Sequence, residues 1–192
     1  MRVDPEEYRA LDLRAHALLA GVPVHDVWAV DLEGRGSDRP MLDLRQLLST
    51  HALTRINPLV RALFGLRRLI GRFSVADRPP PRAAQSSYLG RLSDADREAT
   101  LVAPGTPEGP FQVLYVFAKE SLGEVQNATV HAFSVFALLD RPGGYRFYWA
   151  IHVQPVGGIT RWYMALIDPF RRFVIYPAIL RHVSASWKAS CS

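Results

Sequence analysis

The tail of the chain constrains its fold more than any other segment. Residues Ile159 to Ile167 form an apolar, strand-like run that passes directly into a helical pattern ending near Trp187. The carboxylate of Asp168 is suited to cap this helix, and Pro169 has the fixed φ angle that suits a first helical position. The helix is expected to carry one apolar stripe, composed of Phe173, Val174, Pro177, Leu180, Val183 and Trp187. Such a stripe requires a sheet to pack on, and Pro177 leaves open a kink in the helix.

The segment before this helix supplies strands that could form the sheet. After Pro110 the chain becomes rich in Val, Phe, Tyr and Trp, the residues that favour strands. Four runs are predicted to be strands, Phe111 to Glu120, Glu124 to Leu139, Tyr145 to Gln154 and Ile159 to Ile167. Their separators are short and suited to hairpins, so the four strands are predicted to form an antiparallel meander. An earlier run, Val24 to Leu32, is predicted to be the first strand.

Helical patterns precede and follow that first strand. Asp4 and Pro5 open a first helix, and a second, short helix is entered through Pro40. A third, amphipathic helix is expected from Pro58 to near Gly71. Residues 78–82 read RPPPR, which predicts a stiff, extended connector, and residues 93–98 predict a capped helical turn.

This element order predicts the fold class α+β. Strand, two helices, several antiparallel strands and a long last helix is the order of the helix-grip fold of the START and Bet v 1 group, in which a curved sheet wraps the last helix around a cavity. An α+β sandwich with a filled core is the competing architecture. We expect a single domain over residues 1–192, with its core at about 24–187 and residues 1–20 as an N-terminal helical extension.

Composition narrows the function classes. The net charge is +5, but the basic residues are scattered, whereas a nucleic-acid interface would gather them on one surface with aromatic residues. The one cysteine, Cys191, excludes an internal disulfide and a Cys-based metal site. No run reaches the roughly 20 apolar residues of a membrane span, and the N-terminus does not look like a secretory signal. We expect a cytoplasmic protein without nucleic-acid partners or integral membrane association.

Three runs carry a resemblance to a known family. They are residues 124–133 (EVQNATVHAF), 144–153 (GYRFYWAIHV) and 163–172 (YMALIDPFRR), the last followed by Tyr176 and Pro177. They resemble the bacterial domain of unknown function 2867 family, from about Val24 to Trp187, and the strand-to-helix join at Ile167 to Arg172 is the most specific part. Members of that family occur alone or behind a Rossmann-type dehydrogenase domain. The resemblance implies no catalytic residues.

The sequence lacks the common motifs of catalysis and cofactor binding. It contains no G-x-G-x-x-G, G-x-S-x-G, Walker loop or H-E-x-x-H, and its six histidines have no ligand spacing. No cofactor and no metal site are therefore predicted. A metal site assembled in space from distant residues remains the less favoured alternative.

The predicted strand Glu124 to Leu139 offers a graded face. Asn127, Thr129 and His131 would point the same way, with apolar residues beyond them, as a ligand cavity requires. His131 is thus the candidate general acid or base near neutral pH. The alternative is a structural histidine that is hydrogen-bonded across the sheet.

Further ligand-binding candidates are aromatic or basic. Tyr148 and His152 share a face of one strand, and Tyr115 and Trp162 add aromatic surface with polar tips, although each of these could instead be ordinary core. Arg171 and its neighbour lie in the first helical turn, where the helix dipole disfavours cations. They therefore indicate either a salt bridge to Asp168, Glu120 or Glu124, or a bound anion.

Three hypotheses follow for function. The leading one is a small-molecule-binding protein with a hydrophobic cavity between the meander and the last helix, with cyclase-like or other acid–base activity on a hydrophobic substrate as a further expectation. The second is a non-catalytic accessory or interaction protein that works with a dehydrogenase or biosynthetic partner. A membrane-surface or nucleic-acid role comes third.

Overall fold

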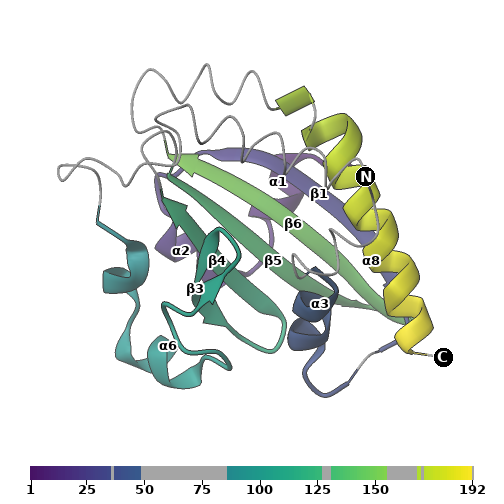
Figure 1. Ribbon diagram of the computed structural model, residues 1–192, viewed down its shortest axis with the longest axis horizontal. Helices are drawn as coiled ribbons and strands as arrows, with labels where there is room; N and C mark the ends of the chain where they lie inside the picture. Colours follow the sequence, from purple (N-terminus) through teal and green to yellow (C-terminus); the bar gives the residue numbers. More distant parts are fainter. Residues whose placement is uncertain (36, 49–85, 127–130, 155–167, 170, 192) are drawn as a thin grey trace.

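The computed structural model describes residues 1–35, 37–48, 86–126, 131–154, 168–169 and 171–191 (Figure 1). The predicted strand at 159–167, the helix from Pro58 and the connector at 78–82 lie outside these residues, as do Asn127, Thr129 and Trp162. The described part is an α+β fold built on one curved antiparallel sheet and a C-terminal helix. No helix in these ranges is long and apolar enough to cross a membrane.

Within the described residues the sheet has six antiparallel strands, in the order β1-β6-β5-β4-β3-β2. They are β1 (Val24–Glu33), β2 (Pro107–Glu108), β3 (Phe111–Val116), β4 (Glu120–Gln126), β5 (His131–Arg141) and β6 (Gly144–Gln154). The chain runs as a meander from β2 to β6, and β1 then pairs with β6. Gly144 begins β6 at a close approach, because a Cβ there would lie 2.0 Å from the carbonyl oxygen of Leu32.

The helices are mostly short. They are α1 (Pro5–Arg9), α2 (Arg14–Leu18), α3 (Pro40–Leu48), the 3-10 helix η2 (Tyr88–Arg91) and α6 (Asp94–Ala99), followed near the C-terminus by the π-helix η3 (Arg171–Ile175) and the long α8 (Tyr176–Ser190). Asp4 caps α1 and Ser93 caps α6 through their side chains. The N-terminal extension is therefore two helices, where the sequence predicts one.

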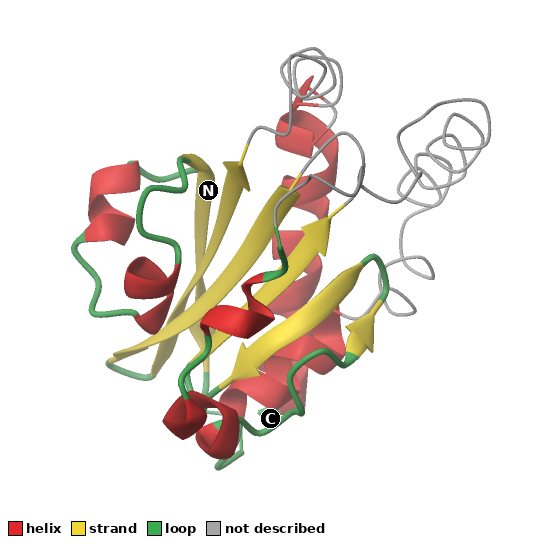
Figure 2. Cartoon of the chain, turned by 90° about the vertical axis from the view of Figure 1, so that its left-hand side faces the viewer, coloured by secondary structure: helices red, strands yellow, loops and turns green. Residues whose placement is uncertain are grey.

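The sheet is covered on both faces (Figure 2). On one face α8 and α3 pack on a core that includes Phe147, Val183 and Trp187. On the other face α1, α2 and η2 pack on a second core, which includes Tyr8 and Phe133. Residues of one strand alternate between the two cores, as side chains of a strand must.

The predicted strand Glu124 to Leu139 is wrong. The structure has two antiparallel strands there, with Gln126 of β4 opposite His131 of β5. The expected turn at Ser121 to Gly123 lies inside β4 instead, and the reversal between β3 and β4 falls at residues 117–119, where the Phe117 N–H donates to the Glu120 carbonyl. Ser121 and Gly123 favour turns, but each pairs with β3 on one side and with β5 on the other. This pairing with two strands overrides their turn propensity.

The apolar stripe of the last helix is only partly correct. Leu180, Val183 and Trp187 are buried on α8, but Phe173 is 81% exposed. Pro177 lacks an N–H and sits in the first turn of α8, and the turn before it is the π-helix η3. A wider turn rotates the preceding residues by about 100° per extra residue relative to α8. Phe173 is therefore turned away from the core.

Candidate functional site

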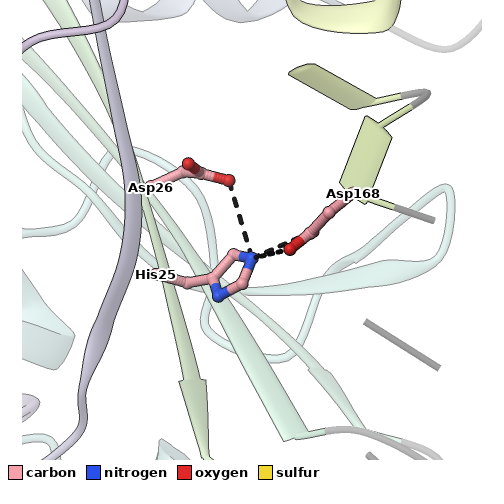
Figure 3. A group of neighbouring side chains, drawn as sticks. All are labelled: His25, Asp26 and Asp168. Carbon is pink, nitrogen blue, oxygen red and sulfur yellow. Dashed lines mark hydrogen bonds and ion pairs between the residues drawn. The ribbon is translucent and has the colours of Figure 1, made fainter. Parts of the chain in front are cut away.

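Three polar side chains from the two ends of the chain converge beside the start of the last helix (Figure 3). His25 and Asp26 belong to β1, and Asp168 precedes η3. The pairing of β1 with β6 shifts register between Val24 and Asp26. Such an irregularity breaks the strict alternation of side chains. Consecutive residues of β1 can therefore both approach Asp168.

Hydrogen bonding orients the His25 ring. Its Nε2 lies 2.9 Å from both carboxylate oxygens of Asp168 and 3.6 Å from Oδ2 of Asp26. We assign the proton of the neutral ring to Nε2, because a carboxylate only accepts. No hydrogen bond to Nδ1 is found within the described ranges, and the side chain is 23% exposed. His25 thus has the geometry of a base held by a carboxylate.

Asp26 is the fully buried member of the cluster. Its oxygens lie 3.4 Å from Nε of Arg2 and 3.3 Å from Nε of Arg172, yet neither oxygen accepts a hydrogen bond from any described residue. The Nε of Arg172 and the indole Nε1 of Trp28 are likewise buried without hydrogen-bond partners. Unsatisfied buried polar groups are costly, so such a concentration of them is unusual in a folded protein.

Arg171 forms the salt bridge that the sequence offered as one of two alternatives. Its guanidinium lies 3.2 Å from Oδ1 of Asp168 and also donates to the hydroxyl of Tyr176. Burial raises the pKa of Tyr176 to about 12, so this hydroxyl stays protonated at neutral pH. Asp168 also bonds to His25 of β1, so Asp168 links Arg171 and the start of the helical segment to β1.

The cluster could in principle hold a cation. Its three ligand atoms lie within 4.8 Å of one another. However, Arg2, Arg171 and Arg172 lie 3.2 to 3.4 Å from the two carboxylates and already provide positive charge there. A divalent ion would have to displace them, so the arrangement fits a metal poorly.

An open groove of about 560 Å³ runs between β1 and α8, and Trp28, two residues after Asp26, is one of its lining residues. Its walls are mostly apolar and include Met1, Trp28, Val30, Pro177, Leu180 and Ala185. Asp26, Trp28 and Val30 are alternate residues of β1 and share the face toward α8, so the cluster lies about 7 Å from Trp28 along the strand. At the other end Lys188 pairs with Glu33 at 2.6 Å.

His131 lies on the opposite face of the sheet from α8, among Tyr88 and Phe133. Its Nε2 is 2.6 Å from Oε1 of Glu124, and both side chains are fully buried. This cross-strand pair matches the structural alternative raised for His131. A ligand held against α8 cannot reach it.

The two aromatic candidates that the structure describes, Tyr115 and Tyr148, lie on that same face. The hydroxyl of Tyr115 donates to Glu120, and burial raises the pKa of Tyr115. The hydroxyl of Tyr148 donates to Glu7 of α1. Glu120 also accepts from the backbone N–H groups of Arg14 and Ala15, at the start of α2. Tyr115 is therefore linked to α2 through Glu120, and Tyr148 is linked to α1 directly. Both lie on the face of the sheet opposite α8.

His152 is also held between structural partners. Its Nδ1 lies 3.1 Å from the carbonyl oxygen of Val22, and its Nε2 lies 3.1 Å from the hydroxyl of Tyr8. The ring is consistent with a neutral tautomer that donates from Nδ1 and accepts at Nε2. Burial lowers the pKa of His152 from its ordinary value of 6.5.

This pKa shift predicts acid sensitivity. Because the folded state disfavours the protonated ring, the unfolded chain binds more protons below about pH 6.5, and stability falls as the pH drops toward the folded pKa. His152→Gln should reduce the slope of unfolding free energy against pH by up to about 1.4 kcal/mol per pH unit in that window. Urea titrations from pH 7.5 to 5 measure it. Tyr8→Phe keeps the imidazole and should keep the slope; an unchanged slope in His152→Gln would contradict the assignment.

His25, Asp26 and Trp28 were not among the candidates from sequence. The sequence points to Asp168 as a helix cap and as one salt-bridge partner for Arg171, but its hydrogen-bonded partner His25 is 143 positions away. The one available signal was the conspicuous strand-to-helix join at Ile167 to Arg172, which provides Asp168 and both arginines. Nothing in the local sequence of β1 indicates its partner.

Fold and site together define an α+β protein with one sheet, a last helix and a polar cluster where the two ends of the chain meet. The chain belongs to the DUF2867 family of proteins of unknown function, whose profile matches residues 18–178. No curated protein and no solved structure matches the chain significantly.

Proposed function

We propose that this protein binds a small molecule with an apolar body in the groove between β1 and α8, with the polar end of the ligand at the His25, Asp26 and Asp168 cluster. The observation that carries the proposal is an apolar groove lined by Trp28, whose buried Nε1, like the nearby atoms of Asp26 and Arg172, has no hydrogen-bond partner among the described residues. Ligand sites are commonly apolar concavities of about 300–1,000 Å³ with a few polar groups that orient the ligand. In this proposal the sheet and the last helix act as in a helix-grip protein.

A neutral fluorescent lipophile tests the groove. N-phenyl-1-naphthylamine should bind saturably, with one molecule per chain, and native mass spectrometry of freshly purified protein should show any co-purified ligand. Ala185 is an exposed groove residue, so Ala185→Trp should fill the groove without disturbing the core and weaken binding about tenfold, or ~1.4 kcal/mol. Ala189→Trp, on the same helix, is the matched control. Equal binding by both variants, or no saturable binding, would refute the proposal.

Acid–base activity is the second candidate function, favoured by the His25–Asp168 pair. Nδ1 of His25 takes a proton from a carbon next to a carbonyl, the C–H electron pair moves to the carbonyl oxygen, and Asp168 stabilises the imidazolium that forms. Returning a solvent-derived deuteron to that carbon completes the exchange. With 2-decanone in D₂O, the wild-type protein should exchange these hydrogens about 10²-fold faster than His25→Gln. Exchange no faster than in buffer would leave a binding protein without this activity.

An accessory role with a protein partner is the competing proposal. It is supported by Phe173 and Met1, which are 81% and 77% exposed. A partner that docks there should be lost from pull-downs with Phe173→Ser and retained with Ala189→Trp. Saturable binding of the lipophile with no stoichiometric partner would favour the small-molecule proposal.

A further inference from the structure

We propose that the ligand carries a carboxylate, so that the groove takes amphipathic acids. This inference rests on the proposed function, since it assigns the head group of the molecule bound there. It draws on three observations: the unused donors of Arg172, the charge balance of the cluster and the unpaired indole of Trp28.

The guanidinium of Arg172 has N–H groups that are available to a ligand. It makes no hydrogen bond with any residue that the structure describes, and the side chain is 33% exposed. Asp26 and Asp168 approach it only at 3.3 and 3.9 Å. The planar guanidinium carries five N–H donors in a fork that matches the two oxygens of a carboxylate. A carboxylate at this position accepts hydrogen bonds from N–H groups that make none within the described residues.

The charge of the cluster favours an anion. The guanidinium groups of Arg2, Arg171 and Arg172 outnumber the carboxylates of Asp26 and Asp168 by one. Because Asp26 is fully buried whereas the side chains of Arg2 and Arg172 are 52% and 33% exposed, a ligand anion meets the guanidinium groups first.

The head group and the apolar body can be one molecule. Trp28 lines the groove and lies two residues from Asp26 on the same face of β1. Its buried Nε1–H has no acceptor among the described residues. An oxygen of the ligand carboxylate, placed between Arg172 and Trp28, provides that acceptor. The alkyl or aromatic body of the ligand then lies along Val30, Pro177 and Leu180.

Competition against N-phenyl-1-naphthylamine at pH 7 tests the head group. Decanoate should displace the probe with an affinity about tenfold higher than that of methyl decanoate, which has the same chain without the charge. Arg172→Gln should remove this preference, because decanoate loses its guanidinium partner and then binds about as weakly as methyl decanoate. Arg39→Gln removes one exposed positive charge elsewhere and should keep the preference.

The outcomes separate this inference from the proposed function. If methyl decanoate binds as tightly as decanoate, the carboxylate assignment is overturned while the groove still binds small molecules. An equal loss of preference in Arg39→Gln and Arg172→Gln would also overturn it, because net charge alone would then explain the selectivity. If neither compound nor the probe binds, both proposals fall.

Discussion

Replacing Glu124 by alanine should lower the free energy of unfolding by about 3–5 kcal/mol, because it removes a fully buried carboxylate that accepts several hydrogen bonds. The carboxylate is fully buried and accepts from the Tyr88 N–H at 3.0 Å, from Ser87 Oγ at 2.6 Å and from Gln112 Nε2 at 2.8 Å, besides its contact with His131. These partners join β4, β5, β3 and the segment that enters η2. Alanine would leave several buried donors without an acceptor.

The same network predicts the response to acid. Burial alone raises the pKa of Glu124, but hydrogen bonds from His131, Ser87 and the Tyr88 N–H outweigh it and hold the pKa below its ordinary value of 4.5. The stabilisation is therefore complete above about pH 4.5 and is lost as the pH falls through the folded pKa. Urea titrations followed by circular dichroism measure both effects. Glu98→Ala, at an exposed position of α6, should change stability by less than about 0.5 kcal/mol; a loss below about 1 kcal/mol in Glu124→Ala would contradict this account.

Trp187→Ala should have a comparable effect, a loss of about 3–5 kcal/mol. The indole is fully buried at the end of α8, its ring meets Tyr145 edge to face at 5.9 Å, and its Nε1 donates to the Gly34 carbonyl at 3.2 Å. It fastens the end of α8 to the turn that follows β1. Chemical denaturation gives the loss directly.

A matched variant separates packing from hydrogen bonding. Trp187→Phe keeps most of the ring but loses the N–H, so it should cost about 1–2 kcal/mol. Because α8 forms one wall of the groove, Trp187→Ala should also weaken binding of the neutral lipophile. Full wild-type stability in Trp187→Ala would show that α8 is held by other contacts.

Much of the fold was predictable because it depends on local patterns. Residues with strand propensity identified β1 and β6, and helical spacing identified the buried face of α8 at Leu180, Val183 and Trp187. The split between β4 and β5 was missed because residues 127–130, which separate the two strands in the sequence, read NATV and contain no Gly or Pro. The exposure of Phe173 was missed because the π-helix changes the helical period just where Pro177 removes a donor.

The site was less predictable than the fold because it depends on contacts between distant segments. His131, Tyr115, Tyr148 and His152 have the chemistry of a site, but strand pairing places them on the face covered by the N-terminal helices. Only Arg171 among the described candidates lies beside the cluster. The local sequence can show that a residue is polar and lies on a strand, but the partner across the sheet decides whether that residue is satisfied.

The most direct test of the central claim is a ¹H–¹⁵N spectrum of the protein during titration with decanoate, observed at the indole resonances of its four tryptophans. The Nε1–H of Trp28 should move downfield and saturate at one ligand per chain, because it gains an acceptor, whereas that of Trp187 should stay in place because it is already bonded to Gly34. A Trp28 resonance that does not move at saturating decanoate would contradict a ligand site in the groove between β1 and α8.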